Sequence, residues 1–261
     1  LWFSAFAEIL IDDIISLNST IKIVNQNTLG SAAGYGTSFN IDRNFTTKDL
    51  NFLTLKYNSL ACQISRNKIE KNTFDTLGNI AFTLSKISMD ICLYLGDEFQ
   101  FISFPDDITT GSSIMPHKKN PDVFEIIRGK CNNIQNLSNS VSLSSTNLPS
   151  GYHRDFQLNK GKIIDAVIEI KECIKILSYC LSKIKVNKKI LEKSNYENIF
   201  SVELINEMVM QGIPFRDAYL KLKNKLSEEK IKGSKKVNYS HIGSIGNLAL
   251  DKIKLKMKEN Y

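Results

Sequence analysis

Long amphipathic helices are the structure that this sequence most strongly predicts. Between residues 77 and 95, and again from residue 163 to 184, apolar residues return every three or four positions, which places them on one helix face. The two series are Leu77, Ile80, Leu84, Ile87, Ile91 and Leu95, and Ile163, Val167, Ile170, Ile174, Leu177, Leu181 and Ile184. A narrow apolar face on a helix of about 25 residues needs partner helices along its whole length. The sequence therefore predicts an all-α fold with a long central helical bundle that extends across subunits.

Other helices are expected from the same spacing. An apolar stripe predicts a first helix over residues 3–21, and residues 62–99 are expected to form a single long helix. Shorter helices should begin near Thr46 and near Phe156. No strand pattern persists along the chain.

Around residue 186 the pattern changes to shorter segments that are richer in Lys and Asn. The tripeptide Gly212-Ile213-Pro214 supplies a helix stop followed by a helix start. The polar run from Lys230 to Asn238 is expected to be a loop. We therefore expect a central bundle domain over residues 1–186 and a small C-terminal helical domain over residues 187–261.

The net charge of +7 limits the kinds of partner. Lysines are most frequent after Lys171, where they alternate with apolar residues at helical spacing, and this is typical of a solvated helix face. No zinc, RNP or aromatic stacking pattern accompanies the charge, so nucleic acid is not expected as a partner. A basic balance also suits small anionic substrates.

The cysteines and the N-terminal segment indicate a cytoplasmic protein without a membrane span. The five Cys residues form no CxxC pair and have no His nearby, so we expect reduced, buried thiols and no metal site. Glu8, Asp12 and Asp13 interrupt the apolar N-terminal segment, which argues against a signal peptide or a membrane helix. The sequence opens inside a helical pattern and without Met, as expected for the later part of a longer protein.

The segment from residue 111 to residue 122 concentrates polar groups suited to binding an anion. It holds small residues, two hydroxyls, two ammonium groups and an amide. Such a loop, expected to span about residues 103–120, is typical of a mobile element that closes over a substrate. Asn120 is also expected to cap the following helix, with Pro121 in its first position. That helix should continue inward through Phe124, Ile127, Cys131, Ile134 and Val141.

A resemblance to a known enzyme family rests on four stretches. Residues 111–120, Gly-Ser-Ser-Ile-Met-Pro-His-Lys-Lys-Asn, resemble the GSSxMPxKxN signature of the fumarase/aspartase superfamily of lyases. Residues 29–34 with 41–43, the signature extended through residue 122 and continued by residues 125–128, residues 148–160 and residues 212–218 resemble the argininosuccinate lyases within it. A Tyr-x-x-x-x-Gln-x-x-Lys spacing in residues 148–160 adds most of the narrower specificity. The resemblance implies cleavage of argininosuccinate to arginine and fumarate without metal or cofactor. It also implies a homotetramer whose active sites are shared between subunits.

The resemblance assigns roles to individual residues. Ser112 would remove a proton from the carbon next to a carboxylate, and Lys118 would stabilise the charge that develops there. Because a free hydroxyl is a weak base near pH 7, the loop must stabilise its alkoxide. Glu125 would orient a catalytic His, which the family carries in a segment absent from this sequence. The residues expected to bind substrate are Asn120, Tyr152, Gln157, Lys160, Arg43, Ser113 and Met115.

Several alternatives stay open from the residues alone. Arg43 can clamp a carboxylate or simply pair with Asp42, and Glu125 can act only as a partner of its helix dipole. His117 occupies a position that the signature leaves free and is not the family's catalytic His. The reaction can also be that of adenylosuccinate lyase, aspartase or fumarase, and the chain can be a catalytically silent relative. Because half of the proton-transfer pair is missing, we expect this chain alone to be inactive.

Overall fold

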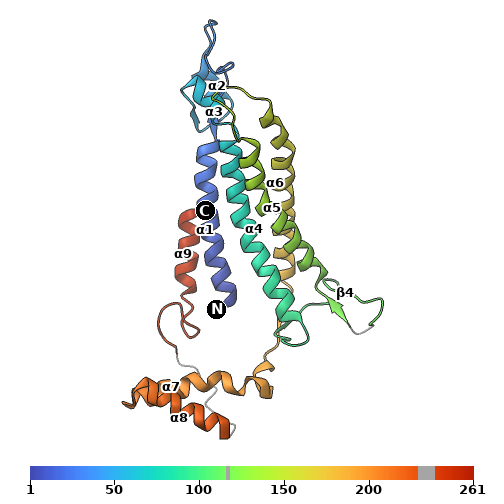
Figure 1. The fold of residues 1–261 in the computed structure, drawn as a ribbon, viewed down its shortest axis with the longest axis vertical. Helices are drawn as coiled ribbons and strands as arrows, with labels where there is room; N and C mark the ends of the chain where they lie inside the picture. The colour runs from blue at the N-terminus through green and yellow to red at the C-terminus, as the bar shows by residue number, and fades with distance from the viewer. Residues whose placement is uncertain (116–117, 229–238) are drawn as a thin grey trace.

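A bundle of long helices dominates the computed structural model, which describes residues 1–115, 118–228 and 239–261. The helices α1 (Trp2–Val24), α4 (Lys68–Leu95), α5 (Asp122–Ser144) and α6 (Lys160–Leu181) run along the long axis of the molecule (Figure 1). The predicted helical bundle is therefore confirmed. No helix in the described part of the chain is both long and apolar enough to cross a membrane.

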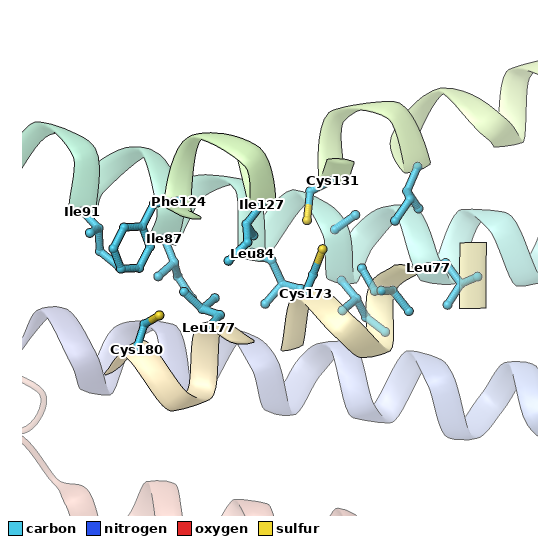
Figure 2. Close-up of a cluster of buried hydrophobic side chains, with 14 of the residues drawn as sticks. Leu77, Leu84, Ile87, Ile91, Phe124, Ile127, Cys131, Cys173, Leu177 and Cys180 are labelled. Carbon is cyan, nitrogen blue, oxygen red and sulfur yellow. The ribbon is translucent and has the colours of Figure 1, made fainter. Parts of the chain in front are cut away.

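The core lies between α4, α5 and α6 (Figure 2). On α4 and α5 the buried residues follow the predicted three- and four-residue spacing. Labelled members of the cluster are Leu77, Leu84, Ile87, Ile91, Phe124, Ile127, Cys131, Cys173, Leu177 and Cys180. Burying one large apolar side chain contributes about 1.5–3 kcal/mol, so this shared face is the main stabilising contact of the bundle.

The apolar face of α6 differs in part from the prediction. Its buried residues are Ala166, Ile170, Cys173, Leu177 and Cys180. Small side chains thus take several core positions, because little space remains between closely packed helices. The predicted core residues Ile174 and Leu181 instead line an apolar groove of about 430 Å³ between α6, α4 and α1.

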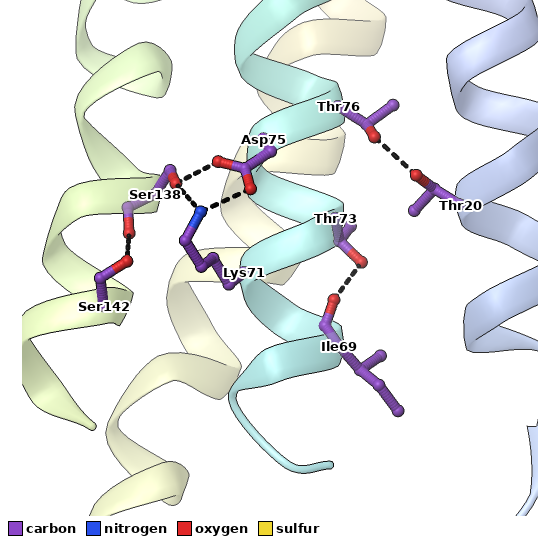
Figure 3. A network of polar contacts seen from close by, with 8 residues as sticks. All are labelled: Thr20, Ile69, Lys71, Thr73, Asp75, Thr76, Ser138 and Ser142. Atoms are coloured by element: carbon purple, nitrogen blue, oxygen red, sulfur yellow. Dashed lines mark hydrogen bonds and ion pairs between the residues drawn. The ribbon is translucent and has the colours of Figure 1, made fainter. Parts of the chain in front are cut away.

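α1 packs on α4 along one side. Trp2 donates a hydrogen bond from Nε1 to Asp90 at 2.8 Å. The hydroxyls of Thr20 and Thr76 lie 2.7 Å apart (Figure 3). The predicted stripe is only partly buried, since Phe3 and Ile21 are 46% and 48% exposed. Within the described parts of the chain, α1 contacts α4 and α9 (Leu250–Asn260), and these two partners leave part of its apolar face exposed.

One end of the bundle carries short elements. They are β1 (Gln26–Asn27), α2 (Arg43–Asp49), β2 (Thr54–Leu55), which pairs with β1 in parallel, and α3 (Ser59–Ile64). α2 begins before the expected Thr46, because the carboxylate of Asp42 accepts hydrogen bonds from the backbone N–H groups of Asn44 and Phe45, both at 2.9 Å.

The single helix predicted over residues 62–99 is wrong, because the chain turns between α3 and α4. Asn67 adopts a left-handed φ of 61° there and is almost fully buried. Its side chain donates to Ser145 and accepts a hydrogen bond from Asn159 at 3.0 Å. These partners are distant in sequence and stabilise the turn, so the spacing of apolar residues could not predict it.

The remaining elements lie towards the opposite end or beside α1, except η1, which lies at the same end as the turn between α3 and α4. They are β3 (Ile102–Ser103) paired antiparallel with β6 (Lys185–Val186), β4 (Thr110–Gly111) paired antiparallel with β5 (Lys119–Asn120), the 3₁₀ turns η1 (Asp155–Asn159), η2 (Ile190–Glu192) and η3 (Ser194–Phe200), and the helices α7 (Ser201–Met210), α8 (Phe215–Glu228) and α9 (Leu250–Asn260). Of these, η1 starts at the residue before the expected Phe156 and leads directly into α6. Each strand has two residues, too short for an alternating sequence pattern.

The region predicted as a C-terminal domain contains two parts. α7 and α8 pack on each other around Ile205, Ala218 and Leu222, with Gly212 at φ 90° in the turn between them. α9 instead lies beside α1, where Nζ of Lys256 is 2.8 Å from a carboxylate oxygen of Asp12 (Figure 1). The loop predicted at Lys230–Asn238 lies outside the described residues.

Candidate active site

The signature loop is a hairpin that projects from the end of the bundle near the start of α5 (Figure 1). β4 and β5 form its base, with Thr110 opposite Asn120 and Gly111 opposite Lys119. Side chains tie this base down: Lys119 pairs with Asp106, and Thr110 donates a hydrogen bond to Asp122. The ion pair with Lys119 holds the pKa of the Asp106 carboxyl below its usual value.

The hydroxyl of Ser112 lies just beyond β4 and accepts two backbone hydrogen bonds. The donors are the N–H groups of Ile114 at 3.2 Å and Met115 at 3.1 Å. The carbonyl of Met115 in turn accepts a hydrogen bond from the N–H of Lys118 at 3.0 Å. Two N–H dipoles aimed at one oxygen favour its negatively charged form. Ser113 and Met115 are both exposed on the loop.

A polar cleft of about 780 Å³ lies behind the hairpin. Lys118, Asn120 and Glu125 line it together with the end of α4 and residues next to β6. Three predicted site residues therefore share one cleft, while Ser112 is not among its lining residues. Glu125 is in the first turn of α5, as predicted for a partner of the helix dipole.

The predicted capping role of Asn120 is wrong. Pro121 occupies the N-cap position of α5, and no side chain caps that helix. The amide of Asn120 donates across the hairpin to the carbonyl of Gly111 at 3.3 Å. Asn120 therefore belongs to strand β5 and does not form the cap of α5 that the sequence pattern predicts.

The second predicted cluster contains Tyr152, Gln157 and Lys160. Gln157 donates a hydrogen bond from Nε2 to the Tyr152 hydroxyl at 3.5 Å, and Lys160 is exposed at the first position of α6. The hydrogen bond from Gln157, and then the contact with Arg66, lowers the pKa of Tyr152. Sequence reasoning missed Arg66, because it placed this residue inside a continuous helix.

The two clusters lie at opposite ends of α5. Glu125 is in the first turn, whereas the Ser144 hydroxyl near the other end accepts a hydrogen bond from Asn159, the residue before Lys160, at 3.0 Å. A helix rises about 1.5 Å per residue, so roughly 30 Å separate the two ends. No small substrate spans that distance, and one chain cannot bring both clusters to one ligand.

Arg43 is engaged with backbone carbonyls. Its guanidinium donates to the carbonyls of Leu29 at 2.8 Å, Lys56 at 2.8 Å and Tyr57 at 3.0 Å. Gly30 next to this contact has φ 78°, and a Cβ there would lie 2.6 Å from Ile41. This arrangement favours a structural role for Arg43 over the predicted carboxylate clamp, and the alternative pair with Asp42 does not form.

The histidines and possible metal ligands add little to either cluster. His117 lies outside the described residues, and the Nε2 of His153 is 2.7 Å from the carbonyl of Pro149. Within residues 1–115, 118–228 and 239–261, no group of three His, Cys, Asp or Glu side chains is placed to hold a metal ion.

Comparison with known families places the chain. Residues 1–136, just over half of it, match the model of a family described as Lyase. The chain belongs to this lyase family. It is 47% identical to the argininosuccinate lyase of Phocaeicola vulgatus over 99% of this chain and 58% of that enzyme. It is 36% identical to the argininosuccinate lyase of Thermotoga neapolitana over 88% of this chain and 58% of that enzyme.

These relatives confirm the resemblance drawn from the lyase motifs, and the chain spans less than two thirds of their length. Solved structures share the fold. An EDDS lyase in complex with formate has a TM-score of 0.76 at 19% identity, and the match covers 99% of this chain and 59% of the EDDS lyase chain. The class II fumarase from Schistosoma mansoni has a TM-score of 0.66 at 16% identity, over 88% of this chain and 56% of its own.

Proposed function

We propose that this chain is part of a cytoplasmic argininosuccinate lyase, which splits argininosuccinate into arginine and fumarate. The observation that carries the proposal is the signature loop, in which Ser112 accepts two N–H bonds and Lys118 lines a cleft together with Glu125 of α5. Relatives named argininosuccinate lyase, nearly half identical over almost the whole chain, support the choice of substrate.

In the proposed reaction Ser112, as its alkoxide, takes a proton from the succinyl carbon next to a carboxylate. The electron pair left behind forms the C=C bond of fumarate, and the C–N bond to the guanidino nitrogen breaks. Lys118 and Asn120 stabilise the negative charge that the carboxylate gains as the proton leaves. The leaving nitrogen needs a proton from an acid outside this chain, which Glu125 orients.

The second cluster binds the amino-acid end of the substrate in this proposal. Tyr152, Gln157 and Lys160 supply a hydroxyl, an amide and an ammonium group, which suit a carboxylate. Because about 30 Å separates them from the loop of the same chain, they serve the loop of another copy. A homotetramer with shared sites meets this requirement, and the apolar groove along α1 and α6 is a surface that such an assembly covers.

The purified 261-residue chain is expected to release no fumarate, because it lacks the acid of the pair. Fumarate release by this chain alone, followed by its ultraviolet absorbance, would contradict the division of labour. A substrate panel on the complete protein separates argininosuccinate from adenylosuccinate, aspartate and malate, the substrates of the nearest alternatives.

Replacing Ser112 by Ala in the complete protein tests the proposed base. Loss of the base should lower kcat by about 100-fold or more, with the tetramer and its melting temperature preserved. Ser19→Ala, which removes an exposed hydroxyl on α1, is the matched control and should leave kcat unchanged. Unchanged turnover in the Ser112 variant would remove the assignment, and no turnover in the unmodified protein would indicate a silent relative.

A further inference from the structure

A second polar cleft, of about 540 Å³, lies between the start of α4, the end of α5 and the segment that precedes η1. Its lining includes three cations, Arg66, Lys68 and Lys71, together with the hydroxyls of Ser142, Ser145 and Ser150. None of its lining residues in the described parts of the chain carries a carboxylate. The cleft is therefore positively charged, and its chemistry suits an anion.

The positive charge is concentrated on two of the three cations. Nζ of Lys71 is 2.6 Å from a carboxylate oxygen of Asp75 and 3.4 Å from the hydroxyl of Ser138 (Figure 3). Within the described parts of the chain, neither Arg66 nor Lys68 has a carboxylate within 4.0 Å. Arg66 and Lys68 thus retain charge for a ligand.

Aromatic rings hold the guanidinium of Arg66 in place. Its central carbon lies 5.1 Å from the ring centre of Tyr152 and 5.1 Å from that of Phe156. Rings hold a guanidinium by its π face, and its N–H groups point outward in its plane. The guanidinium of Arg66 is therefore held beside Tyr152 at the edge of a cleft, where its remaining N–H donors can meet a carboxylate.

We propose that Arg66 binds the α-carboxylate at the amino-acid end of the substrate, beside Tyr152 and Gln157, with Lys68 adding positive charge at the cleft. This inference rests on the proposed function and adds a residue to its second cluster. The simpler alternative is that Arg66 only fastens the segment before η1 to the start of α4. The two differ in whether Arg66 distinguishes ligands by their carboxylate.

The test compares L-arginine with agmatine, which is arginine without its carboxylate, as inhibitors of argininosuccinate cleavage by the complete protein. The unmodified protein should bind arginine at least about tenfold more tightly, as expected for one charge-assisted carboxylate contact. Arg66→Met should reduce this preference to about twofold or less, and Arg66→Lys should give an intermediate value. Arg216→Met, on the exposed surface of α8, is the matched control and should keep the full preference.

A merely structural role would weaken arginine and agmatine equally in Arg66→Met, and that result would overturn the inference. A preference left unchanged in both Arg66 variants would also overturn it. If the Met variant fails to assemble, the Lys variant decides, since its preference must fall below that of the unmodified protein. Absence of argininosuccinate cleavage by the unmodified protein would instead overturn the proposed function, and this inference with it.

Discussion

At the scale of single residues, two arginines of this chain differ by their surroundings. Arg43 meets three backbone carbonyls, whereas Arg66 lies 5.1 Å from each of two ring centres and lines a cleft that has no carboxylate among its described lining residues. Three carbonyl oxygens occupy most of the N–H donors of Arg43, whereas the contacts of Arg66 with aromatic rings leave donors for a ligand. The first arginine is therefore expected to act in folding and the second in binding.

Replacing Arg43 by Ala should lower the free energy of unfolding by about 2 kcal/mol or more, since three carbonyls lose a charged donor. The KM of the complete protein should change little in comparison. Urea denaturation measures the first quantity and steady-state kinetics the second. Lys48→Ala, an exposed lysine on the same short helix, is the control and should be neutral. A raised KM at unchanged stability would restore the carboxylate clamp.

Single residues also show how far the sequence predicted the candidate site. Lys118, Asn120 and Glu125 share a cleft as expected, because a short motif keeps them near one another wherever the loop lies. The hydrogen bond from the Asn120 amide to the Gly111 carbonyl depends on a hairpin, and strands of two residues leave no sequence pattern that predicts it. The contact of Arg66 with Tyr152 joins residues 86 positions apart and needed the fold.

At the scale of elements, apolar spacing predicted the helices well and their neighbours poorly. It found the faces of α4 and α5, which contact helices on either side. It could not find the turn at Asn67 or the groove on α6, because both depend on which helix lies opposite. On α6 the core instead takes Cys173 and Cys180, whose burial agrees with the predicted role of the cysteines.

The contact between α5 and α6 leads to a prediction about thiol chemistry. Cys131 and Cys173 face each other across this contact, and both are buried (Figure 2). Burial, and then the neighbouring Cys173, raises the pKa of Cys131 to about 12. Because the folded state holds this proton more tightly, its contribution to stability is complete below the unfolded pKa near 9 and is lost as the pH rises through about 12.

At pH 8 the folded protein should therefore resist iodoacetamide at Cys131, since only about one thiol in ten thousand would be ionised. Cys92, which is only partly buried, should react faster and serves as the internal reference. Mass spectrometry of peptides after a timed reaction measures both rates. In about 6 M urea the protein should unfold, and the rates at Cys131 and Cys92 should then become equal. Equal rates in the folded protein would show that the α5–α6 contact opens readily.

At the scale of the whole molecule, the bundle separates two sets of site residues. The signature loop lies at one end of α5 and the Tyr152 cluster at the other. If one substrate needs both, each active site must combine different copies of the chain. The apolar surface left on α1 and α6 gives those copies a place to pack.

Mixing two inactive variants of the complete protein tests this arrangement. Ser112→Ala removes the base at one end, and Gln157→Ala removes an amide at the other. When equal amounts are unfolded, mixed and reassembled, sites that draw the two residues from different copies are intact with a chance of one half for each residue. Activity should therefore return to about a quarter of the unmodified value, although each variant reassembled alone stays inactive.

The Ser112→Ala/Gln157→Ala double variant, mixed equally with unmodified protein, provides the matched control. Shared sites predict about a quarter of full activity in this mixture as well, whereas sites contained in one chain predict about a half. The two mixtures thus give equal activities if the sites are shared. If each chain holds its own site, the mixture of single variants has no activity, and the mixture of double variant and unmodified protein has about half of full activity. The second pattern would contradict the shared assembly and require the two ends of α5 to serve separate ligands.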